Sequence, residues 1–382
     1  MSGAADELGR WAWAEIDLEA IEHNVRVLQA VSSPAAVWAV VKADGYGHGS
    51  TDAARAALRA GAEGLCVALV DEGLKLRKAG LAAPILLLSE QPLDRIDDVV
   101  AHRLTPTVYT PRYIRALAEH GGTLPVHINI DTGMQRVGVG HEDLTALIDA
   151  LGATNLQVGG TYTHLACADE PASPANALQL ERFDRALATL RRSGLDAALE
   201  HAGNSGAALA IPDARRSFVR VGIAMYGISP GAGLDDLCGD LRPALSLHAR
   251  VSYVKRVEAG SSVSYGWRHR FDQPTTVVTV PIGYADGVPR RLGTLPDRAG
   301  ADVLIGGRRH RIVGVVTMDQ FMVDVGDADV TVGDEVVLIG QQGDEQIRAG
   351  DWADRLGTIG YEIVCGISAR VPRLVRGRSN LS

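Results

Sequence analysis

Cysteine is scarce in this chain, with four residues among 382, at positions 66, 167, 238 and 365. They are scattered with no close pair, unlike the ligands of a zinc site or the bridges of a disulfide framework. We therefore expect no metal and a reducing compartment. The sequence also lacks an apolar run long enough to cross a bilayer, and its first residues carry acids without a continuous apolar stretch. These absences predict a soluble, cytoplasmic protein without a membrane segment.

An excess of positive charge is missing as well. Lysine and arginine number 38 against 46 acids, a formal net charge of −8, and the basic residues are spread along the chain. This balance argues against a nucleic-acid or anionic membrane surface as partner. At 382 residues the chain exceeds what one hydrophobic core usually supports, so we expect two domains.

From about residue 36 to 225, short apolar or β-branched runs alternate with segments of helical period. Eight strand candidates lie close to helix candidates: AAVWAVVKA, GLCVAL, PILLLS, LTPTVYT, LPVHINID, LQVGGTYTHL, AALEHAG and SFVRVGI. Strands that alternate with helices favour a parallel sheet, and eight of them predict a closed (β/α)8 barrel of the TIM type, an α/β fold. An open doubly wound sheet is the alternative.

The pattern changes after about residue 244. Strand-like runs such as SLHARVSYVKRV and EVVLIGQQG follow, and only IRAGDWADRLG, residues 347–357, is expected to be helical. We therefore expect a barrel domain over residues 1–244 and a mainly β domain over residues 245–382. The segment EIDLEAIEHNVRVLQ, residues 15–29, is expected to add a strand to the β domain and a helix that enters the barrel.

One lysine stands at the end of the first barrel strand, in the stretch AVVKADGYGHG of residues 39–49. Catalytic residues of such barrels collect at the carboxyl ends of the strands, where Lys42 lies. A desolvated lysine amine is a nucleophile toward carbonyls, and Val40 and Val41 supply apolar surroundings. A lysine that merely reaches solvent would explain the charge but not the glycines and Tyr46 that follow. The pattern favours a functional Lys42.

Polar residues also follow other strands at this face. Loops after strands seven and eight are the usual phosphate site of the fold, and Ser205, Gly222 and the amide of Ile223 suit phosphate oxygens. A lysine at one side and a phosphate site across the mouth are what pyridoxal phosphate requires. The polar positions at this face are Arg136 after strand five, His164 after strand six, Asn204 and Ser205 after strand seven, and Arg220 and Gly222 on strand eight.

Nine ordered motifs carry a resemblance along essentially the whole chain. They are AVVKADGYGHG, DTGMQRVG, YTHLACADE, HAGNSGA, VRVGIAMYGI, SVSYG, PIGYADGVPR, TMDQFMVDVG and GYEIVCGISARVPR. The chain resembles the alanine racemase family, whose members are fold-type III pyridoxal 5'-phosphate enzymes. The resemblance implies a homodimer in which the barrel of one chain meets the β domain of the other. It also implies interconversion of L- and D-alanine, with D-alanine supplied for cell-wall peptidoglycan.

The resemblance assigns two acid/base groups. Lys42 would hold the cofactor through a Schiff base and serve as one of them, and Tyr265 of the partner subunit would be the other. Racemisation removes the α-proton on one face and returns a proton on the opposite face, so two flanking groups suffice. A tyrosine needs help to act as a base, and the resemblance implies that His164 assists.

Arg220 matches the residue that faces the pyridine nitrogen in this family. Arginine does not give up its proton, so it would leave that nitrogen unprotonated and weaken the electron sink. A less stabilised carbanion is reprotonated before decarboxylation or transamination can compete, which suits a racemase. A fold-type III decarboxylase, the alternative from another reaction class, would be expected to place an acid there.

The remaining assignments also come from the resemblance. It gives the cofactor phosphate to the hydroxyls of Tyr46 and Tyr361. Arg136 and the amide of Met318 would bind the substrate carboxylate or the cofactor oxygen, and Tyr284 and Arg290 would line the entry corridor.

Two positions depart from the family pattern. Asn129 stands where members commonly have a carbamylated lysine, and an amide cannot carry that negative charge. We expect a bound anion such as chloride, or water, beside Asn129 and Arg136, and a bromide soak without an anomalous peak there would exclude the anion. Thr317 stands where cysteine is common, so cysteine-directed inactivation is not expected at that site.

Substrate size is less sharply defined. A small pocket fits alanine, and Tyr361 would limit the side chain, but one methylene gives only roughly 1–3 kcal/mol of discrimination. We therefore predict serine as a minor substrate and keep a broad-specificity racemase of small amino acids as an alternative. A non-catalytic carrier of the cofactor would leave the Tyr265 motif without a purpose.

Overall fold

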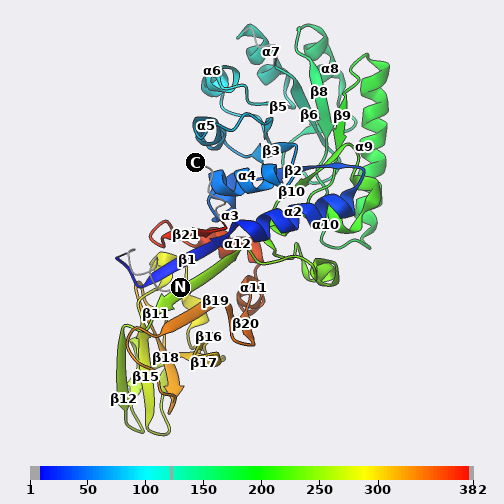
Figure 1. Ribbon diagram of the computed structural model, residues 1–382. Coiled ribbons are helices and arrows are strands. Elements are labelled where there is room, and N and C mark those ends of the chain that lie inside the picture. Colours follow the sequence, from blue (N-terminus) through cyan, green and yellow to red (C-terminus); the bar gives the residue numbers. More distant parts are fainter. Residues whose placement is uncertain (1–8, 121–123, 378–382) are drawn as a thin grey trace. The chain divides into compact units, whose positions relative to one another are not determined.

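The computed structural model describes residues 9–120 and 124–377 of the chain. The chain divides into two compact units. One is continuous, Ala20–Arg242, and the other combines the N-terminal residues up to Glu19 with those from Pro243 onward. In Figure 1 the first unit consists of strands with helices around them, and the second consists mainly of strands.

The first unit is a parallel barrel. Its strands run in the orders β10-β2-β3-β4 and β5-β6-β8-β9. A parallel bridge between Leu86 and Thr105 joins β4 to the start of β5, and the Arg220 amide donates to Gly203 O at 2.9 Å between β10 and the end of β9. The (β/α)8 prediction is thus confirmed over the open sheet. The main strands are β2 Ala36–Val40, β3 Gly64–Val67, β4 Ile85–Leu87, β5 Thr107–Val108, β6 Val126–Asp131, β8 Val158–Tyr162, β9 Leu199–His201 and β10 Phe218–Val221, with a short β7 Val139–Gly140 beside β6.

The helices of this unit cover strands that are buried on both faces, as parallel strands usually are. In α4 the alanines at 53, 54, 56 and 57 are buried, while Asp52 in the first turn and Arg59 in the last suit the helix dipole. The α-helices are α2 Leu18–Ser32, α4 Ser50–Arg59, α5 Val70–Lys78, α6 Ile96–Ala101, α7 Pro111–Glu119, α8 Thr145–Gly152, α9 Pro174–Arg192 and α10 Ser205–Ala210. The segment α3, Lys42–Tyr46, is a short turn whose inner residues have left-handed backbone angles. Short 3-10 helices are η1 Leu93–Arg95, η2 Pro212–Ala214, η3 Ile223–Tyr226 and η4 Ala232–Cys238.

The second unit is built on one large, mostly antiparallel sheet. The N-terminal strand β1, Ala12–Asp17, lies in it between β11, Leu245–Arg250, and β21, Arg373–Arg376. Alternating burial along β18, Phe321–Gly326, is typical of a strand with one face on the core. The other strands are β12 Tyr253–Val257, β13 Ser262–Val263, β14 His269–Arg270, β15 Thr275–Val280, β16 Asp302–Ile305, β17 Arg308–Val313, β19 Glu335–Gln342 and β20 Glu345–Ile347.

The expectation that only residues 347–357 of this unit would be helical is wrong. Helix α11, Ala349–Leu356, forms there, but α12, Gly360–Gly366, follows it. Glycine ends and β-branched residues give α12 low intrinsic propensity. Burial of Ile363 and Val364, which are 3% and 1% exposed, stabilises it through tertiary packing. The short 3-10 helices η5 Tyr265–Trp267, η6 Tyr284–Asp286 and η7 Arg290–Leu292 were also not expected.

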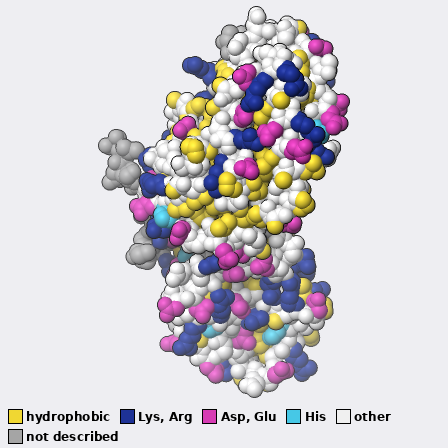
Figure 2. Space-filling model, turned by 90° about the vertical axis from the view of Figure 1, so that its right-hand side faces the viewer, with side chains coloured by type: hydrophobic (Ala, Val, Ile, Leu, Met, Phe, Trp, Pro, Cys, Tyr) yellow, Lys and Arg dark blue, Asp and Glu magenta, His cyan; other side chains and the backbone are white. Residues whose placement is uncertain are grey.

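Basic and acidic side chains are intermixed over the face shown in Figure 2. Within residues 9–120 and 124–377, no helix combines the length and apolar composition needed to cross a membrane.

Candidate active site

Lys42 begins a left-handed turn directly after strand β2. The residues that follow it, Ala43, Asp44, Gly45 and Tyr46, have φ of 51°, 50°, 64° and 54°. A left-handed conformation costs an ordinary L-residue roughly 1–2 kcal/mol, so a run of them persists only where the surroundings fix it. The turn places Lys42 and Tyr46 at the carboxyl end of the first barrel strand.

Two acidic side chains hold this turn in place. Glu72 on α5 accepts a hydrogen bond from the Ala43 amide at 2.6 Å. Asp44 accepts from the Ser50 amide at 3.0 Å and from Lys75 Nζ at 2.6 Å. The acids therefore supply partners for a backbone that is strained by itself.

Tyr46, Ser205 and Gly222 lie close together, which a shared phosphate site would require. The Gly222 amide donates to Ser205 Oγ at 2.8 Å, and Ser205 is only 4% exposed. A Cβ on Gly222 would lie 2.5 Å from Tyr46 Oη, so only glycine admits the tyrosine hydroxyl at this spot. Asn204 caps α10 by accepting from the Ala207 amide at 3.1 Å.

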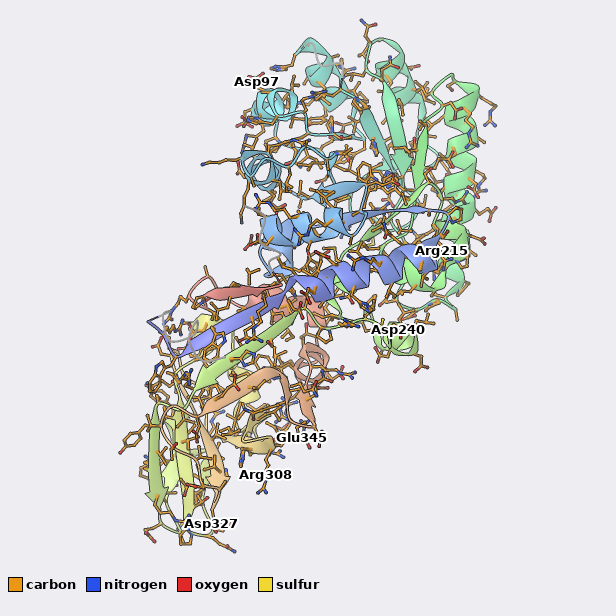
Figure 3. All side chains as sticks on the ribbon, viewed as in Figure 1. Asp97, Arg215, Asp240, Arg308, Asp327 and Glu345 are labelled. Atoms are coloured by element: carbon orange, nitrogen blue, oxygen red, sulfur yellow. The ribbon has the colours of Figure 1, made fainter. Side chains whose placement is uncertain are left out.

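Arg220 is a buried cation. Figure 3 shows Asp97 and Asp327 pointing outward, and their side chains are 85% and 88% exposed, whereas Arg220 is 3% exposed. Its guanidinium lies 5.1 Å from the centroid of the Tyr162 ring. Burial lowers the pKa of Arg220, but an arginine keeps its proton at neutral pH.

The hydrogen bonds of Arg220 go to neutral acceptors. Nη1 donates to His201 Nδ1 at 2.7 Å. Nη2 donates to the carbonyls of Thr163 at 2.9 Å and Ala202 at 3.2 Å, and lies 3.3 Å from His164 Nδ1. Among these described partners there is no carboxylate. A carboxylate among these acceptors would compensate the charge of Arg220. Because these described acceptors are all neutral, the positive field of the guanidinium stays in place.

His164 lies close enough to three cations for their charges to lower its pKa. Burial, and then the charges of Arg220, Arg136 and Lys42, lower the pKa of His164 to about 3. The imidazole is therefore neutral at pH 7. Because Arg220 donates to its Nδ1, the single ring proton of His164 lies on Nε2. Lys42, Arg136, His164 and Arg220 are thus brought to one end of the barrel.

Arg136 is exposed and lies in the loop between β6 and β7. The loop starts with an Asp131 carboxylate that accepts from the amides of Gly133 at 2.9 Å and Gln135 at 3.1 Å. Asn129, one of the two departures from the family pattern, is 4% exposed on β6.

Three buried residues that sequence reasoning did not single out support this site. Gln179 on α9 donates to Thr132 Oγ1 at 3.1 Å and to His164 O at 3.0 Å, and so ties the β6 loop to the end of β8. His201 and His127 lie beneath Arg220, 3.0 Å apart between Nε2 and Nδ1. Polar residues inside apolar strands were the available signal, but strands buried on both faces do not show which side chains point inward.

The predicted residues of the second unit lie on several short elements. Tyr284 and Met318 are close, because the amides of Tyr284 and Ala285 each donate at 3.0 Å to the carbonyls of Thr317 and Met318. Tyr265, on η5, is 73% exposed. Arg290 begins η7 and Tyr361 lies in α12.

The barrel residues fit pyridoxal phosphate. The site has an amine at one strand end, and Gly222 leaves room for a hydroxyl where any Cβ would collide. The buried guanidinium suits an acceptor such as a ring nitrogen, since its other described partners leave its charge uncompensated. The chemistry of the donor set therefore matches an aldehyde, a phosphate and an aromatic nitrogen.

Comparison with known proteins gives full-length matches. Residues 16–230 match the model of the alanine racemase N-terminal domain, and residues 244–375 match that of the alanine racemase C-terminal domain. An alanine racemase from Symbiobacterium thermophilum is 45% identical over 376 residues, 97% of this chain and 98% of that protein.

Solved structures are similar over the same length. The crystal structure of alanine racemase from Bacillus anthracis with bound L-Ala-P has a TM-score of 0.90 and 40% identity, covering 97% of this chain and 96% of that one. A histidine racemase from Leuconostoc mesenteroides has a TM-score of 0.88 and 30% identity, covering 97% and 99%. The same architecture therefore includes proteins described by two different substrates.

Proposed function

The chain belongs to the alanine racemase family, and we propose that Lys42 and Tyr265 of the partner subunit are the two acid/base groups of its reaction. It is an isomerase that interconverts L-alanine and D-alanine and works with pyridoxal 5'-phosphate. The roles proposed below for individual residues are supported by the geometry of each unit and by the chemistry of racemisation.

When bound, pyridoxal phosphate supplies an electron sink that acidifies the α-proton of the amino acid. Lys42 would attach it, and Tyr46, Ser205, Gly222, the Ile223 amide and Tyr361 would hold its phosphate. Asn204 would act through α10, whose first turn it caps. Together these residues would hold and orient the cofactor beside Lys42.

The two proton-transfer groups must flank that carbon. Lys42 follows β2 at the carboxyl end of the strand, and its amine would take or return the proton on one face. On the other face, the exposed hydroxyl of Tyr265 of the partner subunit would do the same. The Nε2 proton of neutral His164 would be the hydrogen-bond donor that stabilises a tyrosinate there.

One observation carries the assignment as a racemase, namely the buried Arg220 whose described acceptors are all neutral. A carboxylate facing the ring nitrogen would keep it protonated and favour long-lived carbanions, as a decarboxylase needs. The guanidinium of Arg220 would instead donate a hydrogen bond to a ring nitrogen placed there, and it has no proton to give up at neutral pH. Fast return of the proton to carbon is the consequence.

Substrate orientation would come from two sides. Arg136 and the Met318 amide would bind the substrate carboxylate or the cofactor oxygen, and Tyr284 and Arg290 would line the entry corridor. Asn129 does not provide a negative charge to orient Arg136, so a bound anion or water beside both side chains would take that part.

We also propose a homodimer with two shared sites, because Tyr265 and the equally exposed Trp267, at 73% and 76%, form an aromatic surface on η5. Burial of such aromatic surface is a common driving force for association. The four free cysteines are compatible with a reducing, cytoplasmic location.

The substrate test compares alanine with serine and histidine, since one similar structure is that of a histidine racemase. Exchange of the α-proton is followed by NMR in D₂O from each enantiomer, with wild type beside Lys42→Ala and Tyr265→Phe. We expect wild type to racemise alanine and, more slowly, serine. Lys42→Ala should lose activity, and Tyr265→Phe should lose racemisation while keeping exchange from one enantiomer.

Two other results would change the proposal. Equal loss of exchange from both enantiomers in Tyr265→Phe would remove the two-base assignment. A wild type that exchanges another amino acid but not alanine would keep the fold and the cofactor and overturn the substrate.

A further inference from the structure

Two buried histidines continue the hydrogen bonding of Arg220, because His201 contacts the guanidinium and His127 contacts His201. We propose that His127 is a positioning residue: its Nδ1 accepts a hydrogen bond that holds His201 in the one tautomer able to accept from Arg220. The inference rests on the proposed function to the extent that Arg220 serves the cofactor nitrogen.

The hydrogen-bond chain has one consistent arrangement of protons. Arg220 Nη1 lies 2.7 Å from His201 Nδ1, and an arginine only donates, so this nitrogen of His201 must be the acceptor. A neutral imidazole carries its proton on the other nitrogen, Nε2. That nitrogen lies 3.0 Å from His127 Nδ1, which must therefore accept. Each step fixes the next, from the guanidinium outward to His127.

Both imidazoles are neutral at physiological pH. Burial lowers the pKa of His127 to about 3, and burial with the charge of Arg220 lowers the pKa of His201 well below its ordinary value. The two side chains are 2% and 0% exposed, so water is a poor substitute partner. The tautomers are consequently set by protein contacts.

Packing fixes the ring planes. His201 lies between the rings of Tyr162 and Phe218, with centroids at 4.7 and 4.1 Å and interplanar angles of 14° and 25°. His127 on β6 faces Gly160 on β8, where a Cβ would lie 2.5 Å from His127 Cε1. A side chain at 160 would displace the imidazole, so Gly160 leaves the space that His127 needs.

The arrangement explains how a buried cation is stabilised without an acid. Two imidazoles aligned head to tail direct the negative ends of their dipoles toward Arg220, and such chains strengthen one another in a low-dielectric interior. Without the acceptor of His127, the Nε2 proton of His201 has no partner. A ring flip or a change of tautomer that gave this proton a partner would turn an N–H of His201 toward the guanidinium, and the repulsion would displace Arg220.

A matched pair of substitutions separates the hydrogen bond from packing. His127→Asn keeps an acceptor near the position of Nδ1, and His127→Leu keeps bulk but removes the acceptor. Wild type and both variants are labelled with ¹⁵N at histidine and studied as apoenzymes by NMR. We expect His201 to be the Nε2–H tautomer in wild type and His127→Asn, and to change or become mixed in His127→Leu.

Cofactor affinity is the second readout. Titration of the same apoenzymes with pyridoxal phosphate should give a dissociation constant roughly tenfold to a hundredfold higher for His127→Leu, because a changed His201 tautomer would cost the charged guanidinium of Arg220 one hydrogen bond. The dissociation constant of His127→Asn should stay near that of wild type. Unchanged His201 tautomer and affinity in a folded His127→Leu chain would overturn the proposal. So would equal losses in both variants, because packing alone would then explain them.

A further variant guards against misfolding. Gly160→Ala leaves His127 in the chain but displaces its ring, so it should reproduce the change of His201 tautomer seen in His127→Leu. Wild-type spectra in a folded Gly160→Ala chain would contradict the positioning role of His127. A failure of the proposed function can be told apart from a failure of this inference. If wild type does not racemise alanine, but His201 is the Nε2–H tautomer in wild type and changes in His127→Leu, the substrate is refuted and the positioning role of His127 stands.

Discussion

At the scale of single residues, the barrel interior keeps a positive charge that it does not neutralise. Desolvating a cation is costly, and a carboxylate partner is the common compensation. Arg220 has instead carbonyls, imidazoles and an aromatic face around it. The free-energy cost of this burial is what a functional role would require, because a carboxylate beside the guanidinium would offset the positive charge that Arg220 presents to a ring nitrogen.

The buried histidines predict a pH-dependent stability. The pKa of His127 is about 3 in the folded chain against an ordinary 6.5, so between these values the unfolded chain binds the additional proton. The free energy of unfolding therefore rises with pH in this window and falls by up to about a few kcal/mol on acidification. Urea unfolding of apo wild type and His127→Asn, measured from pH 7 to 4, should show a shallower fall for the variant. Parallel curves would mean that His127 titrates normally in the folded state.

Gly222 predicts an effect on cofactor binding. A Cβ there would lie 2.5 Å from Tyr46 Oη, so Gly222→Ala must displace the hydroxyl. Loss of one phosphate hydrogen bond should weaken pyridoxal phosphate binding roughly tenfold or more. Gly152→Ala, at a glycine of α8 with nothing within 4 Å of the added carbon, is the control and should bind as wild type. Equal affinities for both variants would exclude Tyr46 from the phosphate site.

How far the sequence predicts the site also depends on single residues. Lys42 and Arg220 stand in distinctive motifs at strand ends, and the structure brings them to one end of the barrel together with His164 and Arg136. His127 and His201 were not predicted. Their importance lies in a 3.0 Å contact across 74 residues of sequence, and a local pattern carries no information on such a pairing.

At the scale of elements, the left-handed turn after β2 is the most unusual local structure of the barrel. Gly45→Ala should cost roughly 1–2 kcal/mol of stability for its φ of 64°, and its added Cβ would also lie 3.2 Å from Ser50 Cα and N. Gly80→Ala, with φ of 82° and nothing within 4 Å of the added Cβ, should have the conformational cost alone. Thermal unfolding should therefore show a larger fall in melting temperature for Gly45→Ala than for Gly80→Ala. Equal shifts would mean that the turn relaxes without cost around residue 45.

The elements themselves were largely predictable. All eight barrel strands form within the expected runs, because alternating apolar and helical segments are a long-range pattern. Helix α12 was missed, since its seven residues from Gly360 to Gly366 have little helical propensity and depend on the burial of Ile363 and Val364. Short elements held by tertiary contacts are where sequence patterns carry least information.

At the scale of the whole molecule, the barrel is inserted into the other unit. The chain forms β1, leaves after Glu19 to build the barrel, and returns at Pro243 to pair β11 with β1. Two chain connections therefore join the units. The N-terminal strand couples completion of the large sheet to prior synthesis of the whole barrel.

A shared active site makes a quantitative prediction for mixed dimers. Lys42→Ala and Tyr265→Phe are each expected to be inactive as racemases, but a dimer with one chain of each kind would have one doubly defective site and one intact site. Random exchange of equal amounts gives half mixed dimers, so activity should return to about one quarter of wild type. The measurement is alanine racemisation before and after subunit exchange, with exchange verified by mass-tagged chains and with each variant incubated alone as control. If mixed dimers form and stay inactive, Tyr265 serves the barrel of its own chain, because only a tyrosine donated across the interface can restore a complete pair.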